Sequence, residues 1–176
     1  MKVNVKIKRL SEDAVIPKYA HEGDAGFDLV AAEDVIIEPG ETKIIPTGLA
    51  IALPPGYEAQ IRPRSGITVK TKLRVQLGTI DAGYNGEIGI IVDNTQFPSE
   101  NYDLVRTTNG EGVLEDFSQY PGSMFGTYQI RKGDRIAQAV INQVEQAQFQ
   151  VVEELDETSR GEAGFGSSGV TTEEAE

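Results

Sequence analysis

Short apolar runs separated by turn residues dominate the chain. Residues 3–7 alternate polar and apolar side chains with a period of two, which predicts a half-buried strand. Proline and glycine close many of the later runs, which favours turns over long helices. The remaining predicted strands are residues 35–37, 43–45, 49–53, 58–62, 88–92, 135–144 and 149–152. With one short helix within residues 66–72, the pattern predicts an all-β barrel or jelly roll.

Two segments interrupt this rhythm. Residues 94–129 are polar and rich in turns, too long for an ordinary connection, and carry Phe97, Tyr102, Phe117, Tyr120, Phe125 and Tyr128. They form either a decorated surface subdomain or a functional insert. After residue 155 the chain turns acidic and then rich in glycine and serine, a composition typical of disorder. We therefore expect a barrel domain over residues 1–155, including the insert 94–129, and a C-terminal arm over residues 156–176.

Charge and composition narrow the class of protein. The net charge of −12 argues against broad binding to nucleic acid backbones. No apolar run approaches the roughly 18 residues of a membrane span, and residues 1–10 lack the apolar core of a signal peptide. Cysteine is absent, which excludes disulfides, zinc fingers and thiol nucleophiles. We expect a cytoplasmic protein with no nucleic-acid or membrane partner, in which any phosphate chemistry needs locally gathered cations or a metal.

Three segments carry side chains suited to anions and metals. Arg64, Ser65 and Gly66 follow a predicted strand directly, and an arginine fork beside a glycine matches phosphate oxygens. An ordinary charged turn is the alternative. Asp28 begins an apolar strand and is either a strand-edge cap or a ligand of a hard cation or its waters. Gln138, predicted on the opposite strand face from Arg135, is either an amide at the edge of the core or a ligand contact.

Residues 78–87 join an acid and an aromatic around a glycine-rich turn. As a hairpin between residues 75–77 and 88–92, the segment would present Asp81 and Tyr84 together. A carboxylate there could orient a water or take its proton, and the aromatic face could pack on a sugar. The alternative is a hairpin whose polar residues only form the turn.

The arm contains a misleading glycine pattern. Gly164, Gly166 and Gly169 satisfy the spacing of a dinucleotide-binding fingerprint, but only seven residues follow, too few for the required βαβ unit. A flexible chain carrying Arg160, Phe165 and paired serines could instead close over a nucleotide, with Phe165 stacked on the base. A disordered linker is the alternative. The single histidine, His21, excludes a two-histidine metal site, and no P-loop motif occurs.

Taken in order, five segments resemble the five motifs of the trimeric dUTPase family. They are Ala25-Gly26-Phe27-Asp28-Leu29, Pro63-Arg64-Ser65-Gly66, residues 78–87, Gly133-Asp134-Arg135-Ile136-Ala137-Gln138, and residues 160–169. Each segment is short, but all five in the family's order cover most of the chain and are highly specific. The resemblance implies a distorted β jelly roll with a flexible C-terminal arm, a homotrimer with three sites at subunit interfaces, and hydrolysis of dUTP to dUMP and pyrophosphate with Mg²⁺.

The resemblance also implies roles for single residues. Asp81 would activate the water that attacks the α-phosphorus, and Tyr84 would pack under the deoxyribose. Backbone around Gly78 and Ile80 would read the uracil edge. Asp28 would hold waters of the metal. The implied phosphate contacts are Arg64, Ser65, Gly66 and Gln138, and the implied cap of the site comprises Arg160, Phe165, Gly166, Ser167 and Ser168.

Three departures from the family pattern stand out. Ala163 replaces the usual glycine and Ser168 the usual threonine, two small changes within the segment that would close over the site. Residues 94–129 exceed the usual length between the third and fourth motifs, which favours a phage-type member acting in the cytoplasm of a bacterial host. Two other functions stay open: a dCTP deaminase-like enzyme of the same broad fold, and a regulatory protein partner bound by the insert through its aromatic residues.

Overall fold

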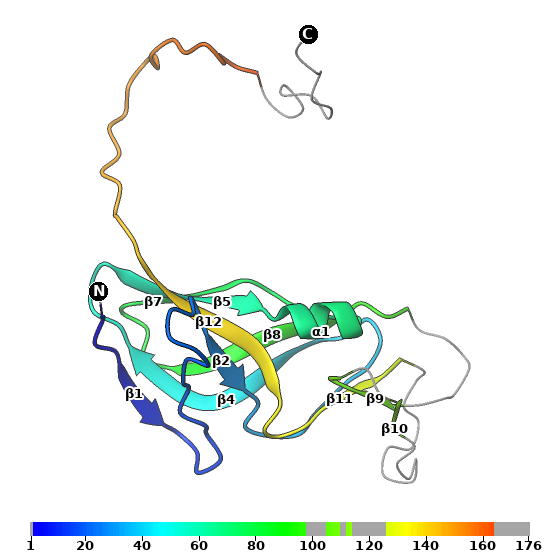
Figure 1. Ribbon diagram of the computed structural model, residues 1–176. Coiled ribbons are helices and arrows are strands. Elements are labelled where there is room, and N and C mark those ends of the chain that lie inside the picture. The colour runs from blue at the N-terminus through cyan, green and yellow to red at the C-terminus, as the bar shows by residue number, and fades with distance from the viewer. Residues whose placement is uncertain (1, 98–104, 110–111, 114–125, 164–176) are drawn as a thin grey trace. The chain divides into compact units, whose positions relative to one another are not determined.

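The computed structural model describes residues 2–97, 105–109, 112–113 and 126–163. Within these residues strands predominate, and the all-β prediction is confirmed (Figure 1). The elements are β1 (Lys6–Arg9), β2 (Phe27–Val30), β3 (Val35–Ile37), β4 (Thr42–Ala52), β5 (Tyr57–Pro63), α1 (Ser65–Lys70), β6 (Leu73–Val75), β7 (Gly78–Asp81), β8 (Glu87–Asn94), β9 (Val105–Thr107), β10 (Gly112–Val113), β11 (Tyr128–Ile130) and β12 (Arg135–Gln143).

The strands form three four-stranded sheets. Their orders are β1-β4-β8-β6, β10-β9-β11-β3 and β2-β12-β5-β7. Pairing is antiparallel except between β11 and β9, which run parallel. Strands distant in sequence therefore become neighbours: β12 lies between β2 and β5, and this places the first, second and fourth of the motif segments side by side.

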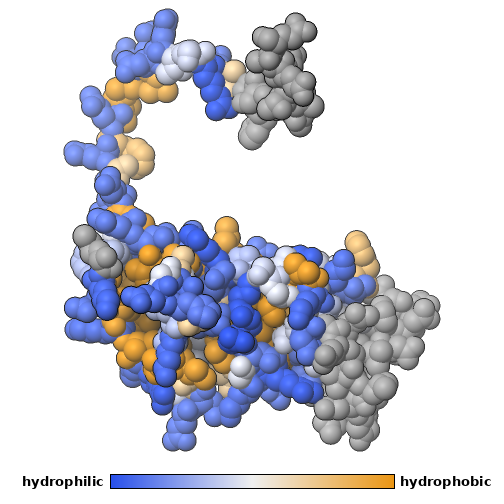
Figure 2. Space-filling view, in the orientation of Figure 1, coloured by the Kyte–Doolittle hydropathy of each residue, from blue (hydrophilic) through white to orange (hydrophobic). Residues whose placement is uncertain are grey.

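Alternation of buried and exposed residues explains how the core forms. In β8, Ile88, Ile90 and Val92 are buried, while the residues between them face outward or are half-buried. The same period of two recurs in β5, where Ala59 and Ile61 point inward. Both strands thus contribute one apolar face to a common core, as the sequence alternation predicts. The visible surface is mostly hydrophilic, with scattered apolar residues (Figure 2).

The sequence predicts two strands, residues 43–45 and 49–53, separated at Pro46, but the structure has one continuous strand, β4. Pro46 pairs with Gly89, and the register with β8 then shifts before Ala50 pairs with Glu87. A proline cannot donate to the ladder, but an irregularity tolerates it. Thr47, fully buried, adds a side-chain bond to β8 at this irregularity by donating its hydroxyl to the Ile88 carbonyl at 2.7 Å. The predicted break was therefore wrong.

Two other strand predictions also need correction. The first strand spans Lys6–Arg9 rather than residues 3–7. The expected hairpin does pair residues 73–75 with β8, but residues 78–81 leave that hairpin and form β7, which pairs with β5 in another sheet. The helix predicted within residues 66–72 is present as α1.

The insert extends a sheet. Strands β9 and β10 add to β11 and β3, so the described part of residues 94–129 includes ordered pairing. Asn94 anchors the base of the insert: its side chain, 1% exposed, donates to the carbonyls of Ile37 at 3.0 Å and Gly126 at 2.9 Å, and accepts from the Gln96 backbone.

Contacts divide the chain into residues 1–145 and 146–176. In the second unit, the strand predicted at residues 149–152 is absent. No strand within the described residues pairs with this segment, and Phe149 and Val151 are 92% and 98% exposed. The boundary predicted at residue 155 stays a prediction. Among the described residues, no helix is long and apolar enough to cross a membrane.

Candidate active site

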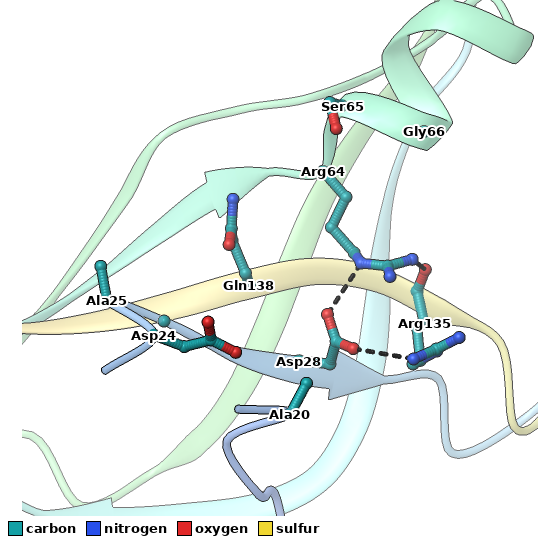
Figure 3. Close-up of a pocket in the computed structure, with 10 residues that line it drawn as sticks. Ala20, Asp24, Ala25, Asp28, Arg64, Ser65, Gly66, Arg135 and Gln138 are labelled. Carbon is teal, nitrogen blue, oxygen red and sulfur yellow. Dashed lines mark hydrogen bonds and ion pairs between the residues drawn. The ribbon is translucent and has the colours of Figure 1, made fainter. Parts of the chain in front are cut away.

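A pocket of about 370 Å³ opens where β2, β5 and β12 lie side by side (Figure 3). Its size is within the range of small-molecule sites. It is lined by Ala20, Asp24, Ala25, Gly26, Asp28, Arg64, Ser65, Gly66, Arg135 and Gln138. Residues of the first, second and fourth motif segments therefore converge on one cavity, as the sequence predicts for Asp28, Arg64, Ser65, Gly66 and Gln138.

Asp28 lies between two arginines in this pocket. Its Oδ1 is 2.8 Å from Arg64 Nε, and its Oδ2 is 3.2 Å from Arg135 Nη1 (Figure 3). Arg64 also donates from Nη1 to the Arg135 carbonyl at 2.9 Å. The Asp28 and Arg64 side chains are only 26% and 28% exposed, so the ion pair between them is partly shielded from solvent, whereas the Arg135 side chain is 59% exposed. The pocket therefore contains two oriented guanidinium groups held by one carboxylate.

The start of α1 explains why Arg64 can reach Asp28. Arg64 is the N-cap residue of this helix, with extended backbone angles, and its side chain makes no capping bond. A guanidinium has no acceptor with which to cap a helix, so it is free to extend across the sheet. The next two residues, Ser65 and Gly66, begin the helix at the pocket wall and are exposed.

An irregularity in β12 changes the predicted face of Arg135. The register with β2 shifts between Arg135 and Ala137, because Val30 and Leu29 pair with these two residues in turn. One extra residue on the β12 strand inverts the alternation. Arg135 and Gln138 consequently line the same pocket, whereas strict alternation predicts opposite faces. That expectation was wrong.

Gln138 is fixed by its neighbours. Its Nε2 donates to the Pro63 carbonyl at 3.0 Å. Gly26, just before β2, lies close to the Gln138 amide, and a Cβ there would sit 3.2 Å from Gln138 Oε1 and 3.1 Å from the Ala139 carbonyl. A larger residue at position 26 would therefore be a tight fit and would press on the Gln138 amide at the pocket wall.

The third motif segment lies elsewhere on the same sheet. Gly78, Ile80 and Asp81 belong to β7, with Ile80 buried and Asp81 exposed. Tyr84 follows in a turn closed by its N–H to the Asp81 carbonyl, and its hydroxyl donates to the Glu87 carbonyl at 2.9 Å. The Tyr84 hydroxyl passes close to Gly86, where a Cβ would lie 2.5 Å away. Asp81 and Tyr84 are thus held together, as predicted.

Asp81 does not meet the pocket within one chain. Asp81 pairs with Glu58 on β5, and Gln138 pairs with Arg62, four residues further along the same strand (62 − 58 = 4). Four residues span about 13 Å along a strand, and β7 is two strands, about 10 Å, from β12. The two Cα atoms are therefore about 16 Å apart.

The fifth motif segment is described only at its beginning. Arg160 is exposed and donates from Nε to the Ala163 carbonyl at 3.0 Å. A small turn precedes it, in which the Gly161 N–H donates to Thr158. The other predicted residues of the arm, Phe165, Gly166, Ser167 and Ser168, lie outside the described residues.

Two charged pocket residues are absent from the set predicted to bind substrate or metal: Asp24 and Arg135. Asp24 comes just before the first motif segment and Arg135 lies within the fourth, so nearness in sequence to Asp28 and Gln138 was the one signal for them, and it does not tell which way the side chains face. Asp24 accepts a bond from the His21 N–H at 2.8 Å, which orients its carboxylate on the loop before β2.

The family model "dUTPase" matches residues 12–98 and 125–169. The deoxyuridine 5'-triphosphate nucleotidohydrolase of Thermobifida fusca is 46% identical over 169 residues, which cover 95% of this chain and 79% of that protein. The dUTPase of Staphylococcus bacteriophage 80alpha with dUPNHPP is 38% identical with a TM-score of 0.87 and covers 95% of this chain and 99% of its own. That phage enzyme is described as controlling transfer of virulence genes by a G protein-like mechanism.

A variant of the dUTPase from phage phi11 of S. aureus, described with a structural Mg(II) ion, is 38% identical with a TM-score of 0.79, over 86% of this chain and 97% of its own. These matches include the segments that build the pocket, the Asp81 turn and the start of the arm. The chain belongs to the dUTPase family.

Proposed function

We propose that this chain is a dUTP diphosphatase that hydrolyses dUTP to dUMP and pyrophosphate in the cytoplasm. The observation that carries the proposal is the convergence of Asp28, Arg64, Ser65, Gly66 and Gln138 on one pocket in a chain of the dUTPase family. Phosphoryl transfer asks mainly for positioning and for neutralisation of charge, and this pocket supplies both.

The phosphates bind where the guanidinium groups are already oriented. Arg64 is held from two sides, by Asp28 and by the Arg135 carbonyl, so little side-chain freedom is lost when an anion arrives. The Ser65 hydroxyl and the Gly66 backbone add donors at the same wall. Gln138 contacts the α-phosphate region, and Arg135 adds a second cation.

The reacting water is bound by Asp81. This carboxylate takes a proton from the water as the new bond to the α-phosphorus forms, and the bond from that phosphorus to the bridging oxygen breaks to release pyrophosphate. Tyr84 packs under the deoxyribose, where a 2′-hydroxyl has no room. Backbone groups near Gly78 and Ile80 pair with the uracil edge, and a cytosine there leaves buried donors or acceptors unpaired.

The residues of the pocket fit a magnesium ion that the substrate brings with it. Within the described residues, no group of three acidic, histidine or cysteine side chains could hold a metal alone. Magnesium usually keeps several waters and takes one or two carboxylates together with substrate phosphates. Asp28 would hold its waters, with Asp24 also at the pocket wall. When bound, the ion neutralises negative charge on the triphosphate.

The separation of the two halves of the site supports an assembly of several copies, and membership of the dUTPase family favours a homotrimer. Asp81 and Gln138 lie about 16 Å apart on one sheet, whereas the water bound by Asp81 must attack the phosphorus whose oxygens Gln138 contacts. A site that uses both therefore takes Asp81 from one copy and the phosphate pocket from another. Phe149 and Val151 are exposed in a segment that pairs with no strand of the described residues, which also favours contact with a neighbouring copy.

Subunit mixing tests this arrangement. Asp81→Asn and Arg64→Ala are each expected to be inactive, but trimers assembled from an equal mixture should recover about a quarter of wild-type activity, since one site in four pairs an intact Asp81 with an intact Arg64 from a different subunit. No recovery would mean that both residues act from one chain.

The arm completes the site. Arg160 binds phosphate, Phe165 stacks on the base, and Gly166, Ser167 and Ser168 close over the nucleotide. Support comes from the family match, which extends to residue 169.

Substrate hydrolysis tests the proposal as a whole. Pyrophosphate and ammonia release are measured from dUTP, dCTP, dTTP and UTP, with and without Mg²⁺. We expect pyrophosphate from dUTP alone among the four, and only weakly without the metal. Ammonia release from dCTP would instead identify a deaminase of the same broad fold.

The insert adds a second proposal, a regulatory protein partner. Phe97, at its start, is 84% exposed, and the family model does not match residues 99–124. Replacing residues 99–124 by a short linker should remove a partner that the wild-type protein captures. The same set of captured proteins with and without the insert would count against this role.

A further inference from the structure

The insert touches a turn that belongs to the phosphate pocket. Thr108, just after β9, donates its hydroxyl to Asp134 Oδ2 at 3.0 Å. Thr108 lies in the segment that the family model does not match, whereas Asp134 lies in the fourth motif segment. Strand β9 also pairs parallel with β11, which leads directly into the turn at residues 131–134 (Figure 1). An added segment thus contacts a shared part of the fold.

Asp134 closes this turn. The Oδ2 atom that accepts from Thr108 also accepts from the Arg131 N–H at 2.9 Å, and the Asp134 N–H donates back to the Arg131 carbonyl at 2.9 Å. The Asp134 carbonyl accepts from the Ala31 N–H at 2.9 Å, and the Gly133 N–H donates to the Ala31 carbonyl. The turn is therefore fixed to the end of β2 by its backbone and to the insert by a side chain.

The next residue, Arg135, links the turn to the pocket, because the position of the turn determines where Arg135 lies. Its side chain shares Asp28 with Arg64, and its carbonyl accepts from Arg64 Nη1 (Figure 3). A change in the turn therefore acts on both guanidinium groups at once. Because hydrogen bonds to a charged group are stronger than those between neutral groups, the contact of Thr108 with the Asp134 carboxylate can bias this geometry.

We propose that Thr108 is a positioning residue for the phosphate pocket, through which the insert sets the placement of Arg135. It acts through the Asp134 turn and touches no substrate atom. This inference rests on the proposed binding of a deoxyuridine triphosphate in the pocket.

Three variants test the contact. Thr108→Val keeps the shape but removes the donor, Thr108→Ser restores the donor, and Thr95→Val is the matched control. Thr95 is another hydroxyl at the base of the insert, but it donates to the Lys72 carbonyl at 2.8 Å, outside the turn. The dissociation constant of dUPNHPP, kcat, KM for dUTP and the melting temperature are measured for each.

Thr108→Val should raise the dissociation constant and KM about three- to tenfold, with a smaller change in kcat. Thr108→Ser and Thr95→Val should stay near the wild type. Wild-type affinity in Thr108→Val would overturn the inference. If the wild-type protein neither binds dUPNHPP nor hydrolyses dUTP, the proposed function fails instead, so the two failures are distinguishable.

A double-mutant cycle with Arg135→Ala separates positioning from general stability. If Thr108 acts through Arg135, Thr108→Val should raise the dissociation constant less in the Arg135→Ala background than in the wild type, because only the contact of the residue 135 carbonyl with Arg64 remains there. The same loss of affinity in both backgrounds would overturn the inference, even where Thr108→Val also lowers the melting temperature.

Discussion

Removing the side chain of Asn94 should destabilise the fold more than any exposed asparagine can. Asn94 is 1% exposed and makes three hydrogen bonds, two of them to the carbonyls of Ile37 and Gly126, which are themselves buried. Asn94→Ala removes the amide donor from both buried carbonyls, at about 1–3 kcal/mol for each. A water entering the space left by the amide offsets part of this loss. We therefore expect a loss of about 2–4 kcal/mol in the free energy of unfolding.

The matched control is Asn142→Ala. Asn142 is half-buried and donates to Glu58 Oε1 at 3.3 Å, a partner that solvent can replace, so its loss should stay below about 1 kcal/mol. Asn94→Asp keeps the size but presents a carboxylate oxygen to both carbonyls, so it should cost at least as much as alanine. Urea unfolding followed by circular dichroism measures all variants at one protein concentration, because oligomer stability depends on concentration. Equal losses for Asn94→Ala and Asn142→Ala would refute the reasoning.

Four further predictions concern the site and one acidic turn. Asp81→Asn should lower kcat about 10²- to 10⁴-fold while dUPNHPP still binds; undiminished turnover would remove its catalytic role. Tyr84→Ala should raise UTP turnover relative to dUTP, and an unchanged ratio would argue against sugar sensing. Truncation after Glu157 should reduce activity sharply while sedimentation still reports a trimer; normal hydrolysis would make the arm dispensable. The pKa of Glu41 lies below its ordinary value. The main cause is the Glu38 N–H, which donates to the Glu41 carboxylate at 2.8 Å; Lys43 lowers the pKa further, and burial acts in the opposite direction. Stability from Glu41 is therefore present above the ordinary glutamate pKa and lost as pH falls through the lowered one. The melting temperatures of wild type and Glu41→Gln should differ at pH 7 and converge in acid, and a constant gap would contradict this assignment.

The pattern of apolar and polar residues predicted most of the elements, because the two kinds of residue alternate regularly along these strands. Strand β8 and helix α1 lie close to the predicted ranges, since their apolar spacing and flanking turn residues act within a few positions. The break at Pro46 failed because a tertiary partner, the Ile88 carbonyl, takes the Thr47 hydroxyl and lets the strand continue. The apolar run at residues 149–152 failed for the opposite reason: no strand in the described chain pairs with it.

The pocket was predictable in composition but not in geometry. Arg64, Ser65 and Gly66 could be picked out because their chemistry suits phosphate. The role of Arg135 could not, because one extra residue in β12 turns its side chain to the face of Gln138. The alternation of residue types along the sequence does not indicate that shift in register. The link from Thr108 to Asp134 likewise joins residues 26 positions apart and depends on the pairing of β9 with β11.

The carboxylate of Asp28 between two arginines has a consequence for how the pocket responds to ionic strength. A polyanion that binds here shares the two guanidinium groups with Asp28 and so weakens the existing ion pairs; it does not meet two bare cations. Dissolved salt weakens the pairs on both sides of that exchange, so its effects largely cancel. The empty pocket also presents little uncompensated charge to chloride or inorganic phosphate. The affinity of the pocket for a triphosphate should therefore stay nearly constant across the salt range of a living cell. Without this arrangement, the net charge of −12 would repel a triphosphate more strongly as the salt concentration falls.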